Sequence, residues 1–409
     1  MNFEELGLAK RLVRKLAEQG ITDPTPIQAK AIPHTLAGRD VMGIAQTGTG
    51  KTAAFGLPMA HNLLKADGKP DPKTVRGLIL APTRELVKQI ADNLSAYTGG
   101  THLKVNLVVG GASINGQIHR LQRGTDLLVA TPGRLIDLLE RKAVRLDVTR
   151  YLVLDEADQM LDMGFIHALR RIAPLLPKDR QTMLFSATMP KLMAELSTAY
   201  LVDPVRVEVS PPGKPADKVS QSLHFIEKEG KTDLLVQHLS EHPGDLSLIF
   251  TRTKHGADRL LKSLQRAGFD AGAIHGNKSQ GQRERAIKAF RSGELTVLVA
   301  TDVAARGLDI PGVRHVYNYN LPNVPDNYVH RIGRTARAGR DGRAVAYCAP
   351  DELGELKAIQ KTMGRDIPAQ NEAPWATAIG DPRGDAAGKS ARPKRNRRRR
   401  PRRGVKKAA

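Results

Sequence analysis

One short stretch of the chain, residues 45–52, has the residue types and spacing needed to bind phosphate groups. It reads Ala45, Gln46, Thr47, Gly48, Thr49, Gly50, Lys51 and Thr52. An apolar run precedes it and a helix-compatible stretch follows, which is the context of a phosphate-binding loop. Glycines let backbone N–H groups converge on phosphate oxygens, and a helix N-terminus adds favourable partial charge. We therefore expect Lys51 to meet the β- and γ-phosphates of a nucleotide, and the Thr52 hydroxyl to bind Mg²⁺.

The first position of this loop departs from the general pattern, because Ala45 stands where Gly is usual. Without support from elsewhere in the chain, the alternative interpretation is an ordinary Gly/Thr turn before a helix.

That support comes from Asp155 and Glu156, which directly follow the apolar run 151–154. A carboxylate at the end of a buried strand is where a phosphate-loop ATPase holds Mg²⁺, and a neighbouring Glu can accept a proton from the attacking water. We assign Asp155 to the metal and Glu156 to the general base. The alternative, acidic residues that leave a strand into solvent, loses weight because the phosphate loop lies upstream.

The composition limits the class of protein. A chain of 409 residues is long enough for two domains, each with its own core. Its one cysteine, Cys348, excludes a disulfide framework and indicates a reducing compartment. No apolar run approaches the roughly 18 residues of a membrane span, and the N-terminus lacks a signal-peptide pattern. We expect a soluble, cytoplasmic protein with no membrane partner, in which Cys348 packs inside a strand.

Much of the net charge of +22 lies at the C-terminus. Residues 383–409 contain 13 Lys or Arg and one acidic residue, Asp385, so they carry +12. A tail this basic, with almost no large apolar residue, is predicted to be disordered and to bind a polyanion such as RNA. A merely solubilising tail is one alternative, and a nuclear-import signal is another if the source is eukaryotic.

Strands must alternate with helices to position these residues. β-prone runs separated by helical stretches predict a mostly parallel sheet that is covered on both faces, with functional loops at the carboxyl ends of its strands. The predicted strands are 41–44, 78–81, 105–109, 127–130, 152–154, 183–185 and 205–209.

A Pro/Gly-rich stretch, 210–215, breaks this rhythm, and a second alternating series follows. Ser279 and Gln282 form a capping box that predicts the start of a helix with Ile287 and Phe290 on one face. The second series of strands is 246–250, 271–274, 297–300, 316–319 and 344–347. The predicted divisions are an ATP-binding domain (1–209), a linker (210–217), a C-terminal α/β domain (218–365) and an extension with the basic tail (366–409).

The ordered set of motifs resembles that of the DEAD-box RNA helicases over about residues 3–340. The resemblance implies an α/β fold of two tandem RecA-like domains that share one nucleotide site. Besides the loop and the acidic motif, the matching segments are the glutamine motif at 20–28, Pro82-Thr83-Arg84-Glu85-Leu86, Gly110-Gly111, Thr131-Pro132-Gly133-Arg134, Ser186-Ala187-Thr188, Ile249-Phe250-Thr251-Arg252, Gln280 with Arg283, the segment 301–307, and His330-Arg331-Ile332-Gly333-Arg334-Thr335-Ala336-Arg337.

For the nucleotide, the resemblance implies that Gln28 reads adenine, which makes the enzyme ATP-specific, and that Phe3 stacks on the base. A frayed terminal residue is the alternative for Phe3. Ile21 replaces a usual aromatic residue, and Ala336 a usual Gly. By the same resemblance Asp309 binds the ribose, Arg334 and Arg337 are arginine fingers for the γ-phosphate, and Asp158, Ser186, Thr188 and His330 couple the nucleotide site to RNA binding.

The implied RNA track is made of small, hydroxylated and guanidinium residues, which suit sugar-phosphate contacts rather than base edges. Aromatic residues are only 4% of the chain, so no stacking platform is expected. Recognition should be independent of sequence and use the 2′-OH to select RNA. The track comprises Thr83, Arg84, Gly110, Gly111, Thr131, Gly133, Arg134, Arg252, Arg283 and Thr301.

The leading hypothesis is a monomeric, bacterial-type, ATP-dependent RNA helicase. ATP and RNA would close the two lobes, separate a short duplex, and open the lobes again after hydrolysis. Two hypotheses compete with it: an ATP-gated RNA clamp or annealing factor that depends on the tail, and a DNA-stimulated translocase. Ribosome assembly, RNA turnover and growth in the cold are the expected settings, with proteins of the first two as possible partners.

Overall fold

The computed structural model describes residues 2–46, 48–66, 68–189, 192–209, 219–305, 310–336, 341–373 and 375. The predicted linker, 210–217, and the basic tail, 383–409, lie outside these ranges. Three predicted site residues also lie outside the described ranges, namely Thr47, Asp309 and Arg337.

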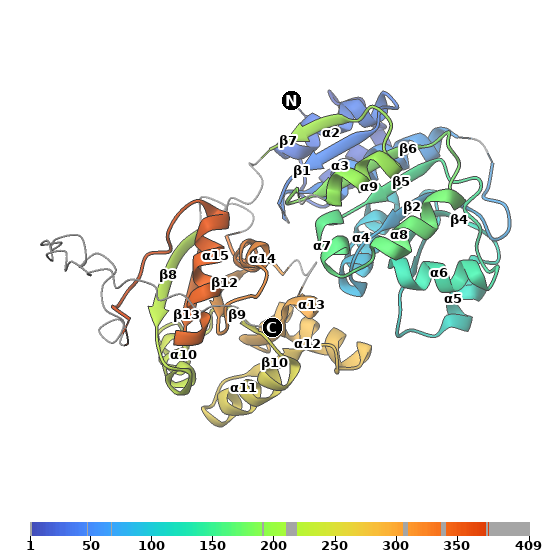
Figure 1. Ribbon diagram of the computed structural model, residues 1–409. Helices are drawn as coiled ribbons and strands as arrows, with labels where there is room; N and C mark the ends of the chain where they lie inside the picture. Colours follow the sequence, from blue (N-terminus) through green and yellow to red (C-terminus); the bar gives the residue numbers. More distant parts are fainter. Residues whose placement is uncertain are drawn as a thin grey trace, which may run out of the picture. The chain divides into compact units, whose positions relative to one another are not determined.

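The first lobe is built on a seven-stranded sheet in which every neighbouring pair is parallel. The strand order is β3-β4-β2-β5-β6-β1-β7, and the strands are coloured from blue to green in Figure 1. All seven predicted strands are present. Their bounds are β1 Val41–Ile44, β2 Val75–Leu80, β3 Val105–Val108, β4 Thr125–Ala130, β5 Tyr151–Leu154, β6 Gln181–Ser186 and β7 Val205–Glu208.

Helices cover both faces of this sheet because its central strands are apolar on both sides. One core cluster joins Ile79 and Val153 to helices α1–α4, and the other joins Leu80 and Leu154 to helices α5–α9. The helices are α1 Lys10–Ala17, α2 Pro26–Leu36, α3 Lys51–Lys65, α4 Arg84–Thr98, α5 Ile114–Leu121, α6 Pro132–Glu140, α7 Ala157–Asp162, α8 Ile166–Ile172 and α9 Leu192–Tyr200, with a 3₁₀ turn, η1, at Ala173–Leu175.

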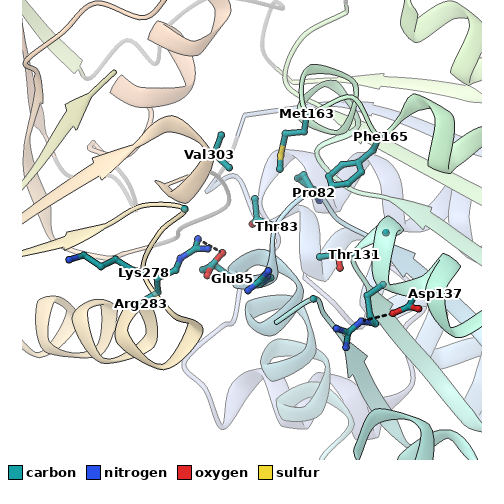
Figure 2. A pocket seen from close by; sticks show the side chains of 15 residues that line it. Pro82, Thr83, Glu85, Thr131, Asp137, Met163, Phe165, Lys278, Arg283 and Val303 are labelled. Carbon is teal, nitrogen blue, oxygen red and sulfur yellow. Dashed lines mark ion pairs between the residues drawn. The ribbon is translucent and has the colours of Figure 1, made fainter. Parts of the chain in front are cut away.

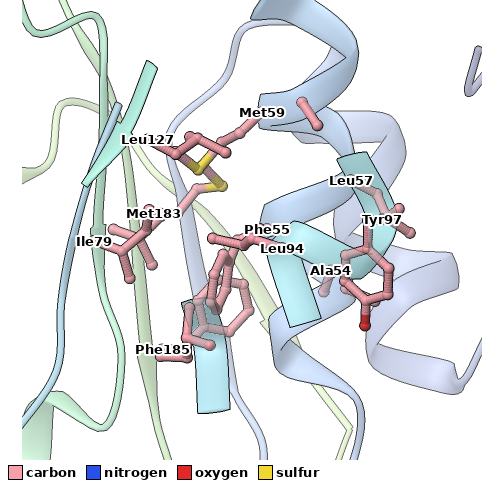
Figure 3. Packing of buried hydrophobic residues seen from close by; sticks show 14 of the residues in the cluster. Ala54, Phe55, Leu57, Met59, Ile79, Leu94, Tyr97, Leu127, Met183 and Phe185 are labelled. Carbon is pink, nitrogen blue, oxygen red and sulfur yellow. The ribbon is translucent and has the colours of Figure 1, made fainter. Parts of the chain in front are cut away.

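The helix that follows the phosphate loop is fixed by aromatic and sulfur-containing side chains. Phe55 of α3 packs on Phe185 of β6, with ring centroids 5.6 Å apart and planes tilted by 50°. Met59, Leu127 and Met183 continue the same core beside them (Figure 3). All five side chains are fully buried, so the start of α3 is held rigidly against the strand that neighbours β1.

The second lobe contains a six-stranded parallel sheet with the order β10-β11-β9-β12-β13-β8. The five predicted strands are present, and β8 is an addition that the sequence did not predict. The bounds are β8 Val219–Phe225, β9 Leu246–Thr251, β10 Ala271–Ile274, β11 Val297–Thr301, β12 Val313–Asn318 and β13 Gly342–Cys348.

Helices again lie on both faces of the sheet. The predicted capping box is confirmed: Ser279 accepts a hydrogen bond from the Gln282 N–H, and the Gln282 side chain accepts one from the Ser279 N–H. Ile287 and Phe290 of that helix are buried. The helices are α10 Lys231–Ser240, α11 Lys254–Arg266, α12 Gln280–Ser292, α13 Asp302–Ala305, α14 Pro325–Ile332 and α15 Leu353–Met363, with 3₁₀ turns η2 at Lys228–Gly230 and η3 at Pro350–Glu352.

The edge strand β8 pairs with the chain that follows α15. Leu223 donates its N–H to Pro368 O and accepts from Gln370 N–H, both at 2.8 Å. The side chain of Asn371 bonds to both backbone groups of Phe225, at 2.9 and 2.8 Å. The compact unit formed by the two sheets ends at Asn371.

Two expectations from composition can be compared with this fold. Cys348 is the last residue of β13 and is completely buried, as predicted for a packing residue, and burial raises the pKa of its thiol to about 12. Within the described ranges, none of the helices combines the length and the apolar character needed to cross a lipid bilayer.

Candidate active site

The phosphate loop leaves β1 and enters α3, as predicted. Gly48 and Gly50 have φ values of 86° and 91°, a region that side-chain-bearing residues rarely adopt. At Gly50 there is also no room for a side chain, because a Cβ atom would lie 2.3 Å from Gln28 Nε2. The glycine at this position is therefore required both by the backbone conformation and by the approach of Gln28.

The glutamine motif contacts the loop directly. Gln28 Nε2 donates to Gly50 O at 3.0 Å, and Thr25 Oγ1 donates to Thr49 O at 2.8 Å. The Gln28 carbonyl accepts from the Thr25 N–H at 2.9 Å. The residue predicted to read adenine thus also holds the phosphate loop, and the two sites are mechanically connected.

The predicted base-stacking residue, Phe3, is only 1% exposed and packs in the first lobe's core. The alternative of a frayed terminal residue is therefore wrong. In this conformation the ring offers no free face to a base, so stacking on adenine stays a prediction that requires the N-terminal segment to move.

Lys51 begins α3 and its ammonium group faces the acidic motif. Nζ lies 3.8 Å from Asp155 Oδ1, and the two side chains are 5% and 3% exposed. Among the described residues, Nζ is a buried donor that makes no hydrogen bond. A buried ammonium group whose N–H donors make no hydrogen bond can accommodate an anionic ligand, because leaving those donors without a partner carries a free-energy cost. Thr52 follows in the first turn of the same helix, half-buried.

Asp155 directly follows β5 and is almost completely buried. Burial raises the pKa of its carboxyl group to about 6; the charge of Lys51 opposes this effect and that of Glu156 adds to it. Asp155 Oδ1 also accepts the Glu156 N–H at 3.0 Å. Glu156 itself has a φ of 51°, which is strained for a residue with a side chain. Such outliers gather at functional sites, so the strain supports the choice of Glu156 as a catalytic residue.

Asp158 connects this motif to the next strand. Its Oδ2 atom accepts hydrogen bonds from the N–H groups of Ala187 and Thr188, at 3.1 and 2.8 Å, and from the Thr188 hydroxyl at 2.8 Å. Ser186 donates its hydroxyl to Thr188 O at 2.7 Å. The predicted coupling residues of the first lobe therefore form one hydrogen-bonded unit.

The same carboxylate contacts the second lobe. His330 Nε2 lies 3.6 Å from Asp158 Oδ2, with both side chains buried. Burial raises the pKa of Asp158, but the neighbouring His330, Lys51 and Thr188 outweigh it, and the net pKa lies well below the usual range. Asp158 is thus ionised, is hydrogen-bonded within the first lobe, and lies close to His330 of the second.

Arg334, a predicted arginine finger, is 3% exposed in this conformation. Its Nε donates back to His330 O at 3.2 Å. The guanidinium therefore packs against its own helix, and a role at the γ-phosphate requires it to turn outward.

A residue that the sequence analysis did not assign, Arg331, organises the same helix. Its guanidinium binds both carboxylate oxygens of Asp302, donates to Asn318 Oδ1 at 3.0 Å, and lies over the Phe250 ring at 5.0 Å from the centroid. Arg331 is 2% exposed. A fully paired, buried arginine of this kind fixes α14 to the ends of three strands. Its only sequence signal is its position inside the last motif.

The predicted RNA-binding residues of the first lobe follow β2, β3 and β4, whereas the predicted nucleotide-binding residues lie at other strands. Thr83 caps α4 after β2, and its Oγ1 accepts from the Leu86 N–H at 3.2 Å. The Arg84 guanidinium lies against the Gly110-Gly111 turn after β3, where a Cβ on Gly111 would lie 2.1 Å from Arg84 Nη1. After β4, Thr131 directly precedes α6, and Arg134 donates to Ala112 O at 3.0 Å.

In the second lobe, Arg252 follows β9 and Thr301 ends β11. Arg252 is tied to Glu352 and Glu355 at 3.5 and 3.4 Å. Glu352 in turn pairs with the buried ammonium of Lys231. A network that includes a buried ion pair therefore positions the guanidinium of Arg252.

Arg283 of α12 joins the two lobes. Its Nη2 atom lies 2.9 Å from Glu85 Oε2 of α4 (Figure 2). Gln280 adds contacts to Arg84 and Glu85 at 3.3 and 3.4 Å. Glu85 is a further residue that the sequence analysis quoted in a motif without giving it a role.

A cavity of about 480 Å³ lies beside this contact. It brings together predicted RNA residues of both lobes, namely Thr83, Arg84, Gly110, Thr131, Gly133, Arg134 and Arg283. Pro82, Met163 and Phe165 line the same cavity on one side (Figure 2). This apolar wall was not predicted, because a low aromatic content says nothing about where the few aromatic residues lie.

The strand order separates two kinds of loop at the carboxyl edge of the first sheet. The phosphate loop follows β1, the acidic motif follows β5, and Ser186 ends β6; these three strands are neighbours. The predicted RNA residues follow β2, β3 and β4, which form the other half of the sheet. A parallel sheet that carries such a site, repeated by a second lobe without a phosphate loop, defines a nucleoside-triphosphate hydrolase of the two-lobed RecA-like class.

Comparison with known proteins identifies the family. Residues 25–196 match the model of the DEAD/DEAH box helicases, and residues 230–339 match that of the helicase conserved C-terminal domain. The chain belongs to the DEAD-box ATP-dependent RNA helicases. It is 42% identical over 377 residues to the ATP-dependent RNA helicase CshA of Listeria monocytogenes, a match that covers 92% of this chain and 72% of the relative. The CshA of Limosilactobacillus reuteri is 44% identical over 88% of this chain and 72% of its own length.

Solved structures show the same fold. Dbp5 of S. cerevisiae bound to RNA and ADP BeF3 superposes with a TM-score of 0.81 at 33% identity, over 92% of this chain and 97% of that one. The DEAD-box helicase Mss116 bound to ssRNA and UDP-BeF gives a TM-score of 0.83 at 29% identity, over 91% of this chain and 79% of that one. The predicted fold of two RecA-like lobes is confirmed.

Proposed function

We propose that this helicase hydrolyses ATP when RNA closes its two lobes, and that closure separates a short duplex locally. The observation that carries the proposal is the position of Asp158. Its carboxylate is bound by Thr188 in the first lobe and lies 3.6 Å from His330 in the second. Because Asp158 belongs to the acidic motif and contacts both lobes, it can make ATP hydrolysis depend on the arrangement of the lobes.

Each side chain near the carboxyl ends of β1, β5 and β6 has a separate role in binding or hydrolysing ATP. Lys51 pairs with the β- and γ-phosphates in place of Asp155, and Glu156 accepts the proton of the attacking water. Gln28 reads the adenine, Asp309 holds the ribose, and the backbone of the loop from Gln46 to Gly50 cradles the phosphates.

The donor set also fits Mg²⁺, because it offers a buried carboxylate, Asp155, and a hydroxyl, Thr52, next to a phosphate loop. These two residues would hold the ion, which when bound neutralises charge on the phosphate oxygens.

Arg334 and Arg337 complete the site from the second lobe. An arginine finger contributes on the order of 10³ to 10⁵ in rate. Because Arg334 bonds to its own helix at His330 O, its turn toward the γ-phosphate is a step that closure must drive. The rate of ATP hydrolysis should therefore be low before the lobes close.

The loops that follow β2, β3 and β4 bind the sugar-phosphate backbone of RNA through the guanidinium and hydroxyl groups around the cavity. Arg84 and Arg283 are oriented before RNA arrives, by Gly111 and Glu85 respectively. Contacts of this type position RNA without reading its sequence. The basic tail, 383–409, adds affinity that depends on salt.

We extend the proposal to the setting of the enzyme: a cytoplasmic monomer that acts in ribosome assembly or RNA turnover. The single, buried thiol of Cys348 supports a reducing compartment, and the similarity to bacterial relatives supports the bacterial setting.

The rate of ATP hydrolysis tests the proposal. It should be measured without polymer, with single-stranded DNA and with RNA, in the wild type and in Glu156→Gln. We expect stimulation by RNA alone and its loss in the variant. Equal stimulation by DNA would favour the translocase hypothesis, and RNA binding without stimulation would favour the clamp.

A further inference from the structure

Four histidines gather in the second lobe, away from every motif discussed above. His224 and His238 have ring centroids 4.8 Å apart, and His242 and His315 stack at 4.5 Å. Tyr317 lies between the two pairs, 6.2 Å from His238 and 6.1 Å from His315. The helicase reaction gives none of these residues a role.

One of the two pairs includes a carboxylate. His242, Asp245 and His315 each offer a ligand atom, and these atoms all lie within 4.8 Å of one another. His315 Nε2 lies 3.0 Å from Asp245 Oδ2. Two imidazoles and one carboxylate are a usual protein donor set for zinc and related dications.

The fold brings these residues together from two separate segments. His242 and Asp245 lie in the turn between α10 and β9, where the Asp245 N–H donates to His242 O at 3.3 Å. His315 belongs to β12, and its partner across the parallel ladder is Ser247, two residues after Asp245. His315 is 4% exposed, so its ring cannot leave the site, whereas the other two are partly exposed to a ligand from solvent.

The cluster lies at the amino ends of the strands, beside the first residues of β8, β9 and β13. A cavity of about 570 Å³ opens there, lined by all three residues. The helicase residues Arg252, Thr301 and His330 instead follow the carboxyl ends. A ligand in this cavity would therefore neither touch the nucleotide nor block the RNA track.

The Arg343 guanidinium already occupies a nitrogen lone pair of His242 that a metal ion could use. Arg343 Nη1 lies 2.8 Å from His242 Nε2. Because a guanidinium can only donate, His242 Nε2 accepts this hydrogen bond through its ring lone pair, which is the lone pair that a metal ion bound at Nε2 would use. Arg343 is exposed, so a metal ion can displace its side chain into water.

We propose that His242, Asp245 and His315 bind a transition-metal dication of the zinc type, in competition with Arg343. The ion would take two imidazole nitrogens and one carboxylate oxygen, and water would complete its coordination. It would fasten the turn after α10 to β12 and so stabilise the second lobe.

The test is titration of the full-length protein with Zn²⁺ by calorimetry, and with Co²⁺ by visible absorption, in excess Mg²⁺ so that the carboxylates of the nucleotide site are occupied. We expect one site in the wild type. Binding should weaken at least tenfold in His242→Gln and in Asp245→Asn, and tighten in Arg343→Gln. Zn²⁺ should also raise the Tm of the wild type but not that of Asp245→Asn.

The matched control is His238→Gln, since His238 belongs to the same aromatic cluster but bonds through Nδ1 to the Tyr347 hydroxyl at 2.8 Å. It should bind the metal as the wild type does. Because His242 and Asp245 lie partly exposed, both variants should fold, and a circular dichroism spectrum checks this. Absence of a Co²⁺ signal in the wild type, or equal affinity in folded His242→Gln and the wild type, overturns the proposal.

Discussion

The carboxylate of Asp158 and the imidazole of His330 approach each other to 3.6 Å, and they belong to different lobes. A contact of this kind couples two sites when ligands change the distance between them. The coupling energies of such systems typically correspond to a factor of about 5 to 150 in affinity or population.

Replacement of His330 should therefore uncouple RNA binding from hydrolysis. We expect His330→Asn, which shortens the side chain, to lower RNA-stimulated ATPase activity by about 5- to 150-fold. His330→Gln, whose amide reaches the position of Nε2, should recover part of the loss. His167→Gln, at an exposed histidine of α8, is the control. Full stimulation in His330→Asn would show that the contact has no role.

The ion pair between Glu85 and Arg283 should contribute to closure. The atoms lie 2.9 Å apart and both side chains are nearly buried. In a double-mutant cycle of Glu85→Gln and Arg283→Gln, we expect a coupling energy of about 0.5–3 kcal/mol, measured from the RNA concentration that half-saturates ATPase activity. Lys288→Gln, on the same helix but exposed, should change little. Strictly additive effects would contradict a direct interaction in the closed enzyme.

The close approach at Gly50 makes a separate prediction. Gly50→Ala places a methyl group 2.3 Å from Gln28 Nε2, at a φ of 91°. We expect ATP binding to fall at least tenfold, together with a stability loss of about 1–3 kcal/mol from the strained backbone. Gly38→Ala has a comparable φ of 78° but open space around it, so it should lose stability without losing ATP affinity. Equal affinities of the two variants would argue against a role for the contact between Gln28 and the loop.

His61 should make the first lobe less stable in acid. Its Nδ1 accepts the Ala9 N–H at 2.9 Å, which requires the neutral ring. Burial, and to a lesser extent the charge of Lys65, lowers the pKa of His61 from 6.5. The unfolded chain therefore binds more protons below pH 6.5, and the free energy of unfolding should decrease as the pH falls through that window toward the folded pKa.

His61→Asn keeps an acceptor near the position of Nδ1 and cannot be protonated. We expect denaturant unfolding of this variant to lose part of its pH dependence below pH 6.5, relative to the wild type. His102→Asn, at an exposed histidine in a loop, is the control. An unchanged pH dependence in His61→Asn would mean that His61 is not the group responsible.

The basic tail should govern the salt dependence of RNA binding. On single strands, log K falls with log salt at a slope of roughly −0.7 per phosphate neutralised. Deletion of residues 383–409 should make this slope shallower by several such increments, measured by fluorescence anisotropy, while RNA-stimulated hydrolysis by the two lobes persists. A slope that does not change would exclude the tail from RNA binding.

Much of the framework could be predicted because it is encoded locally. Buried parallel strands are short apolar runs, so β1 and β5 are evident in the sequence, and the capping box at Ser279 marks a helix start. β8 was missed because it lies beside a single strand, β13, and its Ser and Gln residues leave no apolar run.

The site was harder to predict where it depends on tertiary contacts. The motif residues could be named, but neither the burial of Arg334 nor the pairing of Arg331 with Asp302 has a signal in the local sequence. The His242, Asp245 and His315 cluster was missed for a related reason. Its segments meet only because β9 pairs with β12, and no sequence motif predicts the register of that pairing.

The pairing of residues 368–371 with β8 has a practical consequence for any attempt to shorten the protein. Truncation near residue 365, where the sequence places the end of the second domain, would strip the hydrogen-bonding partner from Leu223 and Phe225. A bare β-edge recruits other strands, including those of neighbouring molecules. A fragment cut there would tend to polymerise, whereas one that ends after Asn371 carries its own protection against self-association.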